Sequence, residues 1–197
     1  MLEEARALGF LGPGPVVGHI EHAAGFIQAV GEPHPTRVVD LGSGGGVPGL
    51  VVAGAWPGAR VFLLDSSERR ALFLAQAVAA LGLSARVVVG HARAEDAGRD
   101  PAWRAQADVV LARSFGPPGV TAECAAPLLA VQGRLVVSEP PDGDGERWPA
   151  ARLAELGLRP AGRFEQSFSR FQVLRQDRLC PPAFPRRVGV PAKRPLF

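Results

Sequence analysis

Four residue types are scarce in this chain of 197 residues: it has two cysteines, one methionine, no tyrosine and, among 22 basic residues, the single lysine Lys193. Cys124 and Cys180 lie far apart and form no Cys-x-x-Cys pair, so the sequence favours neither a zinc site nor a disulfide framework. We expect no metal ion. The shortage of lysine accompanies 24 glycines and 19 prolines, a bias that we attribute to genomic base composition.

The chain also lacks a long apolar run. No hydrophobic stretch reaches the roughly 20 residues that a membrane-spanning helix needs, and the acidic start, Met1 to Glu4, is unlike a signal peptide. Hydrophobic residues make up 47% of the chain, which is enough for one substantial core. We therefore expect a single globular domain that is cytoplasmic and monomeric, with no membrane partner.

Acidic residues are missing after Asp177, although the net charge of the whole chain is only +3. Five basic residues follow this position: Arg178, Arg186, Arg187, Lys193 and Arg194. A basic terminal segment can bind a phosphate backbone, which makes the last four of these residues candidate RNA-binding residues. The alternative is a solvated tail, or arginines that cap the ends of helices.

The most informative stretch runs from Asp40 to Gly49 and reads DLGSGGGVPG. It follows an apolar strand pattern, and its glycines at 42, 44 and 46 allow positive φ and leave no Cβ between the backbone and a ligand. The acid stands two residues before the first glycine, unlike the acid of a dinucleotide fingerprint, which lies on the next strand. An acid there can meet a cationic group, and S-adenosylmethionine offers an ammonium and a sulfonium. A tight turn without a ligand is the alternative.

A second acid ends the next strand pattern. Asp65 follows the apolar run 60–64 and lies 19 residues after Gly46. A carboxylate at the tip of the second strand can accept both ribose hydroxyls of a nucleoside. The alternative is that Asp65 is the N-cap of the helix that follows, and both interpretations can hold because Ser66 or Ser67 could cap the helix while Asp65 binds. The loop and the two acids together predict a cofactor that contains a nucleoside.

Strand and helix patterns alternate along the chain, which is typical of an α/β fold. Helices are expected at 2–11, 16–30, 48–55, 67–81, 120–130 and 146–156. Strands are expected at 37–40, 60–65, 85–90, 107–112, 134–138, 163–168 and 170–175, and the last two pair antiparallel. The sequence thus predicts a mostly parallel, doubly wound sheet with an antiparallel C-terminal hairpin. Residues 1–36 form a short N-terminal helical extension, 37–179 the main domain and 180–197 an extended, basic, Pro-rich tail.

In a doubly wound sheet, ligands collect beyond the carboxyl ends of the strands. The strand tips expected to hold functional residues are Asp40, Asp65, 91–95, 113–115 and 138–142. His19 and His22 share a helix, but no third metal ligand accompanies them, so we interpret them as surface or packing residues.

Several of these segments resemble the bacterial family of small-subunit ribosomal RNA guanine-N7 methyltransferases, also called glucose-inhibited division protein B. The family loop reads approximately DLGSGAGFPG. Further matching blocks are Ser67–Leu74, Arg93–Glu95, Asp108–Arg113 and Pro185–Leu196, so the resemblance covers about 37–197. It implies a class I, Rossmann-like fold dependent on S-adenosylmethionine (SAM), with small-subunit rRNA or its ribonucleoprotein as partner.

The resemblance also implies which residues hold the cofactor. Carried over to this chain, they are Gly42, Val47, Asp65 with Ser66 and Ser67, Ala94, Glu95 and Arg113. Val47 stands where the family has an aromatic residue, and it can simply pack. Glu95 can instead cap a turn, and Arg113 can instead form a structural ion pair with Asp40 or Glu139.

On the acceptor side, Arg113, Ser114 and Phe115 follow the fourth strand, where Phe115 either stacks on a base or folds onto the core. Guanine N7 carries a lone pair and no proton, so no general base is required. Two departures stand on this side: Glu139-Pro140 replaces the family's Lys-Gly, and only 36 residues, without the family's Asn-Leu-Thr element, precede the first strand. The alternatives are therefore another RNA or small-molecule acceptor, or a catalytically idle SAM-binding protein.

Overall fold

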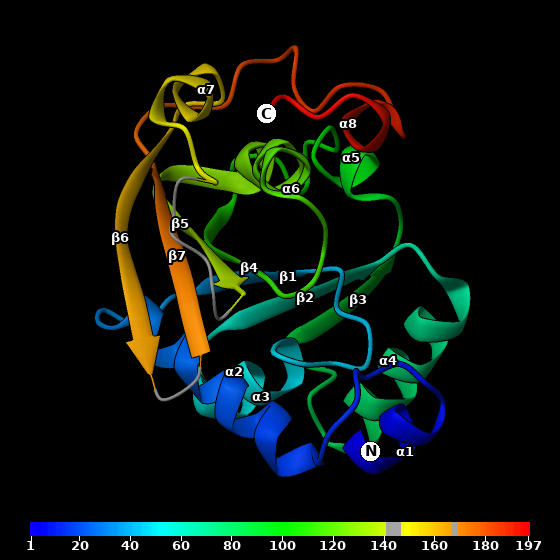
Figure 1. Ribbon diagram of the computed structural model, residues 1–197. Coiled ribbons are helices and arrows are strands. Elements are labelled where there is room, and N and C mark those ends of the chain that lie inside the picture. The colour runs from blue at the N-terminus through cyan, green and yellow to red at the C-terminus, as the bar shows by residue number, and fades with distance from the viewer. Residues whose placement is uncertain (141–146, 167–168) are drawn as a thin grey trace.

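The computed structural model describes residues 1–140, 147–166 and 169–197, which form one seven-stranded sheet with helices on both faces (Figure 1). The strands are β1 Arg37–Leu41, β2 Arg60–Asp65, β3 Val87–His91, β4 Ala107–Ala112, β5 Leu129–Glu139, β6 Leu158–Gln166 and β7 Ser169–Gln176. Their order is β3-β2-β1-β4-β5-β7-β6; the first five strands are parallel, and β7 pairs antiparallel with β5 and β6.

The helices cover the two faces in separate groups (Figure 1). They are α1 Leu2–Ala7, α2 Val16–Val30, α3 Gly49–Ala55, α4 Glu68–Ala80, α5 Ala94–Ala97, α6 Pro118–Ala125, α7 Ala150–Glu155 and α8 Val190–Lys193, with a 3-10 turn, η1, at Ala126–Leu128. One hydrophobic cluster includes side chains of α2, α3 and α4, and the other includes side chains of α5, α6 and α7.

Strand β4 shows why the sheet is buried on both sides. Val109 and Leu111 belong to one cluster and Val110 and Ala112 to the other, because successive side chains of a strand point to opposite faces. All four are fully buried. A near-continuous apolar run is typical of a parallel strand with helices on both faces, and this run places the polar residues that follow it at the edge of the sheet.

The strand order reverses between β1 and β4. From β1 the chain moves to β2 and β3 on one side, and it then returns to β4 on the other. The loops after these two strands therefore diverge and leave a crevice at their carboxyl ends, which is where ligands bind in open α/β sheets. Asp40 and Arg113, near the ends of β1 and β4, lie at this point.

The predicted fold class is confirmed by the sheet, and most strands lie within two residues of their predicted positions. The predicted helix 120–130 is wrong at its end, because Leu129 and Ala130 already belong to β5. Pro127 interrupts the helix, and Leu129 pairs with Ala107 of β4. The tail, predicted to be extended, contains the short helix α8. Glu146 and Phe168, predicted to lie in a helix and a strand, are outside the described residues.

No helix within the described ranges is long and apolar enough to cross a membrane. The same residues contain no group of three or more His, Cys, Asp or Glu side chains that could hold a metal ion.

Candidate functional site

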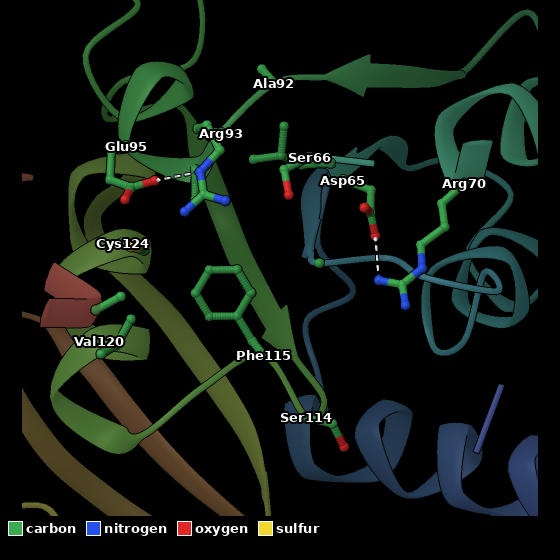
Figure 2. A pocket seen from close by; sticks show the side chains of 14 residues that line it. Asp65, Ser66, Arg70, Ala92, Arg93, Glu95, Ser114, Phe115, Val120 and Cys124 are labelled. Carbon is green, nitrogen blue, oxygen red and sulfur yellow. Dashed lines mark ion pairs between the residues drawn. The ribbon is translucent and has the colours of Figure 1, made fainter. Parts of the chain in front are cut away.

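Two adjoining cavities open at the carboxyl ends of the central strands. The larger, about 240 Å³, is called here the Asp65 cavity (Figure 2); the smaller, about 190 Å³, is called the Arg113 cavity. The Asp65 cavity is lined by Gly42, Leu64, Asp65, Ser66, Arg70, Ala92, Arg93, Ala94, Glu95, Ser114, Phe115, Val120, Cys124 and Ala192. The Arg113 cavity is lined by Phe10, Leu11, Gly12, Gly42, Ser43, Gly44, Gly45, Val47, Arg70, Arg113 and Ser114. Gly42, Arg70 and Ser114 line both cavities, so the two adjoin, and the pair is called here the cleft.

The glycine loop between β1 and α3 forms the shared wall of this cleft. Gly42 and Gly44 have φ values of +75° and +54°, which side chains rarely adopt. A Cβ on Gly42 would lie 2.8 Å from the ring of Phe115. The absence of side chains at these positions therefore lets both a ligand and the Phe115 ring approach the backbone.

Asp40 lies beneath the loop and lines neither cavity. Its Oδ2 atom accepts a hydrogen bond of 3.0 Å from the backbone N–H of Gly49, the first residue of α3. Burial raises the pKa of Asp40 to about 7, although hydrogen bonds from Gly49 and Ser43 oppose the shift. In this structure the carboxyl group ties the end of β1 to the start of α3 and thereby holds the glycine loop. Contact of Asp40 with a cofactor remains a prediction.

Asp65 accepts hydrogen bonds from two backbone N–H groups. Its Oδ1 accepts a hydrogen bond of 2.8 Å from the N–H of Ser67, the N-cap residue of α4, and its Oδ2 accepts one of 2.9 Å from the N–H of Gly44. Arg70 lies 3.9 Å away (Figure 2). Each carboxylate oxygen has two acceptor sites. Asp65 therefore caps the helix, fixes the glycine loop and retains acceptor sites in the cavity that it lines.

Glu95 forms the opposite end of the Asp65 cavity (Figure 2). It lies on α5 and is only 3% exposed. Its Oε1 accepts a hydrogen bond of 2.9 Å from the N–H of Gly189 in the C-terminal segment, and Arg93 lies 3.7 Å from its other oxygen. Ala192, from the same segment, lines this cavity as well. The C-terminal segment therefore closes the end of the cavity that Glu95 occupies.

Arg113 lines the Arg113 cavity, and its contact inside the protein is a histidine. Its Nη2 lies 2.7 Å from Nδ1 of His19, while Nε2 of His19 lies 3.1 Å from the carbonyl oxygen of Gly12. Burial lowers the pKa of Arg113, and the charge of Asp40 opposes this shift. Within the described ranges Arg113 makes no ion pair, and Glu139, the other predicted partner, pairs with Arg147 at 2.9 Å.

Sequence reasoning interpreted His19 as a surface or packing residue and so missed its contact with Arg113. It is 5% exposed and packs in α2, as that interpretation allowed. A lone histidine on a helix carries no signal for a partner 94 residues away. Packing of α2 in the hydrophobic core is what brings His19 to the strand tips.

Ser114 lines both cavities, and Phe115 lines the Asp65 cavity. Ser114 is exposed and has a φ of +52°, an unusual value for a residue with a side chain. The ring of Phe115 is half-buried, packs against the hydrophobic cluster and projects into the Asp65 cavity, as Figure 2 shows. Phe115 thus packs against the core, as one alternative predicted, and also lines the cavity, whereas its stacking on a base stays a prediction.

The N-terminal segment covers the glycine loop from outside. A Cβ on Gly45 would lie 2.8 Å from the side chain of Leu11 and 3.0 Å from the carbonyl oxygen of Phe10. The Phe10 ring packs edge-on against Phe73, and Arg70 lies 6.0 Å from its centroid. Phe10, Leu11 and Arg70 line the cleft, although none of them was among the predicted site residues.

The tail arginines have different surroundings. Arg186 is held by Glu123, a fully buried residue of α6, through Nε at 2.8 Å and Nη2 at 2.6 Å. It also donates to the carbonyl oxygen of Arg194 at 2.7 Å. Arg187, Lys193 and Arg194 have exposed side chains. The structure thus places Arg186 in an internal ion pair and the other three residues at the surface.

The predicted cofactor residues that line the cleft are Gly42, Gly44, Val47, Asp65, Ser66, Ala94, Glu95 and Arg113. Gly46, Ser67 and Asp40 lie behind it. A Cβ on Gly46 would lie 2.4 Å from the Leu50 side chain, which explains the need for glycine there without a ligand.

Comparison with known proteins connects this cleft to one family. The sequence profile described as rRNA small subunit methyltransferase G matches residues 16–139. Ribosomal RNA small subunit methyltransferase G of Prochlorococcus marinus is 42% identical over 170 residues, which cover 82% of this chain and 68% of the relative. The enzymes of the same description from Moorella thermoacetica and Symbiobacterium thermophilum are 32% and 37% identical, and the matches cover 77% and 78% of their lengths.

Solved structures share the fold at low sequence identity. The mitomycin 7-O-methyltransferase MmcR has a TM-score of 0.61 at 19% identity, with 80% of this chain and 53% of that chain covered. A 16S rRNA methyltransferase from T. thermophilus, solved in complex with AdoMet and guanosine, has a TM-score of 0.52 at 21% identity, with 79% and 39% covered. These likenesses establish a class I methyltransferase fold.

Proposed function

Because the chain belongs to the family of rRNA small subunit methyltransferase G, we propose that it transfers a methyl group from SAM to guanine N7 of small-subunit ribosomal RNA. The single observation that carries this proposal is the cleft at the reversal of strand order. A glycine loop and a carboxylate from neighbouring strand tips line it together, and Gly44 and Asp65 are joined by a hydrogen bond of 2.9 Å.

The residues present fit SAM. In the Asp65 cavity, the remaining acceptor sites of Asp65 suit ribose hydroxyls, and Ala94 and Glu95 suit the adenine end. In the Arg113 cavity, a half-buried guanidinium without an ion-pair partner among the described residues suits a carboxylate, and the methionine portion of SAM carries one. Gly42 lines both cavities, so a ligand that occupied both would lie against its backbone.

The chemistry asked of the protein is alignment. When bound, SAM supplies a sulfonium-activated methyl group. The lone pair of guanine N7 attacks the methyl carbon in line, the carbon–sulfur bond breaks, and its electron pair stays on sulfur. No proton leaves N7, so no general base is needed. Holding the two reactants at this distance and angle provides much of the acceleration in such reactions.

Phe115 and Ser114 are the residues that we assign to the acceptor. They stand at the tip of β4 and line the cleft, where the methyl group and a base would meet. The half-buried Phe115 ring offers a face on which a base can stack. Glu139, which replaces a cation of the family, is paired with Arg147 at 2.9 Å, so its negative charge is compensated beside an RNA.

We further propose that the exposed tail residues Arg187, Lys193 and Arg194 contact the RNA backbone, while Arg186 anchors the tail to Glu123. The proposed partner is ribosomal RNA or its ribonucleoprotein, met in the cytoplasm by a monomer. Support comes from the family and from the position of the tail beside the Asp65 cavity.

Mass spectrometry of small-subunit rRNA from a deletion strain tests the acceptor. We expect loss of one N7-methylguanosine, its full return with the intact gene and a smaller return with Asp65→Ala. Full N7-methylguanosine content in the deletion strain would instead favour another acceptor. Calorimetry with SAM, combined with turnover assays, tests whether the protein is catalytically idle. If the protein bound SAM but methylated no RNA, it would be a SAM-binding protein without this activity.

A further inference from the structure

The residue that contacts Arg113 inside the protein is the buried histidine His19. We propose that His19 is a positioning residue: its neutral imidazole holds the Arg113 guanidinium against the Arg113 cavity and leaves the positive charge free for the carboxylate of the methyl donor. This inference rests on the proposed function for the identity of the donor. It adds a residue to which neither the motifs nor the family resemblance assigned a role.

The hydrogen bonds define one state of the imidazole. A guanidinium only donates, so Nδ1 of His19, 2.7 Å from Nη2 of Arg113, must accept and carry no proton. The proton of the neutral ring then lies on Nε2, which donates to the carbonyl oxygen of Gly12 at 3.1 Å. Both ring nitrogens are therefore used, and a doubly protonated ring could not accept from Arg113.

A neutral partner, unlike a carboxylate, leaves the positive charge of Arg113 uncompensated. A carboxylate would satisfy the charge of Arg113 inside the protein and compete with an anionic ligand for the same donors. His19 orients the guanidinium through one Nη atom and neutralises nothing. Asp40, the nearby buried carboxyl group, is bonded to the N–H of Gly49 and makes no hydrogen bond to Arg113 within the described residues. Arg113 thus remains a half-buried cation at the wall of a cavity, which is a feature of anion-binding sites.

The same imidazole also fixes the facing wall. Gly12 lies with Phe10 and Leu11 in the segment that covers the glycine loop and lines the Arg113 cavity. One side chain therefore links the end of β4, the start of α2 and this covering segment. Loss of His19 would release both the guanidinium and the segment at Gly12. We therefore expect a larger effect on the affinity for SAM than on the rate of the chemical step.

Three substitutions separate the two hydrogen bonds. His19→Leu removes both, and we expect its dissociation constant for SAM to rise about tenfold, as the loss of a hydrogen bond to a charged group implies. His19→Asn places an amide oxygen near the position of Nδ1, so it should recover most of the affinity. His19→Gln places a polar atom near Nε2 instead and should recover less. KM for SAM should follow the dissociation constant, with a smaller change in kcat.

His22→Leu is the matched control, because His22 lies one turn further along α2 and packs against Phe26 and Phe171. It should leave SAM affinity unchanged. The assignment would be overturned if His19→Leu bound SAM as tightly as the unchanged protein. It would also be overturned if His19→Asn bound SAM as weakly as His19→Leu at a matched melting temperature. If His19→Leu fails to fold, the comparison of Asn with Gln decides. Failure of the unchanged protein to bind SAM would count against the proposed function itself, which keeps the two failures distinct.

Discussion

Two carboxylates end neighbouring strands, and the structure gives them different surroundings. Asp65 lines the Asp65 cavity, whereas Asp40 lies under the glycine loop with its oxygen bonded to the N–H of Gly49. From the sequence both looked like ligand contacts, since both precede turns at the same edge of the sheet. Which side of the loop each carboxyl group occupies depends on the path of the backbone, and local residue patterns do not encode that path.

The first prediction concerns Asp65. Asp65→Ala should weaken SAM binding by about 1–3 kcal/mol, because it removes the proposed acceptor of the ribose hydroxyls and leaves the N–H of Gly44 without its partner. Calorimetry with SAM measures the change. Ser66→Ala, at the next position along the cavity wall, is the control and should cost less. Unchanged affinity of Asp65→Ala would restrict Asp65 to capping α4.

The second prediction follows from the pKa of Asp40, which burial raises to about 7, far above its value in an unfolded chain. The folded state then binds more protons than the unfolded state between about pH 4 and 7, so this contribution to stability is present at low pH and lost as the pH rises through 7. Asp40→Asn keeps an acceptor for Gly49 and removes the titration. Relative to the unchanged protein, it should gain about 2–3 kcal/mol between pH 5 and 8.

Urea unfolding of both proteins at the two pH values measures this gain. The quantity to compare is the difference in unfolding free energy between the two proteins at each pH. Burial lowers the pKa of His22 to about 4, so His22 makes each protein less stable as the pH falls below 6.5, opposite to the effect of Asp40. His22 is present in both proteins and cancels. A gap between the two proteins that does not change with pH would contradict the prediction.

At the scale of elements, the C-terminal segment is where the sequence-based prediction and the structure differ most. Its composition suggested an exposed basic arm, yet Arg186 is bound to the fully buried Glu123 and Gly189 donates to Glu95. Composition reveals the charge of a segment but not the acids that it meets. Both acids lie more than 60 residues earlier in the chain.

The strands and α2 were predictable because their apolar periodicity is local. The end of α6 was not predictable, because pairing of Leu129 with Ala107 overrides helical propensity.

Arg186→Gln should therefore lower the free energy of unfolding by about 3–5 kcal/mol, since it leaves the carboxylate of Glu123 buried without its cation. The matched control is Arg152→Gln on α7, whose pair with Glu155 is exposed and should contribute at most about 1 kcal/mol. Chemical denaturation of the two variants gives both values. Equal, small losses would mean that the tail does not depend on this ion pair.

The exposed tail residues should behave differently. Arg187→Gln and Lys193→Gln should each leave stability and SAM affinity unchanged, weaken RNA binding, and reduce by about one the slope of log affinity against log salt concentration. Titration of labelled rRNA at several salt concentrations provides the slope. A slope equal to that of the unchanged protein would remove these residues from the RNA interface.

At the scale of the whole molecule, the cleft draws on segments from both ends of the sequence. Residues 10–12, the loops after β1, β2 and β4, and Ala192 all line it. A ligand that binds there holds these segments together, so saturation with SAM should stabilise the entire fold. At a hundredfold excess over the dissociation constant the gain is about 2.7 kcal/mol, visible as a rise in melting temperature. An equal concentration of NAD is the control and should produce no rise.

The closure of the Asp65 cavity by Gly189 and Ala192 has a consequence for biosynthesis. The chain is synthesised from its N-terminus onward, so the last strand, β7, precedes this wall in synthesis. A polypeptide stalled or cleaved ahead of residue 189 would have the glycine loop and Asp65 but would lack one side of the Asp65 cavity. Donor binding at the proposed site would therefore depend on residues that are synthesised after all seven strands.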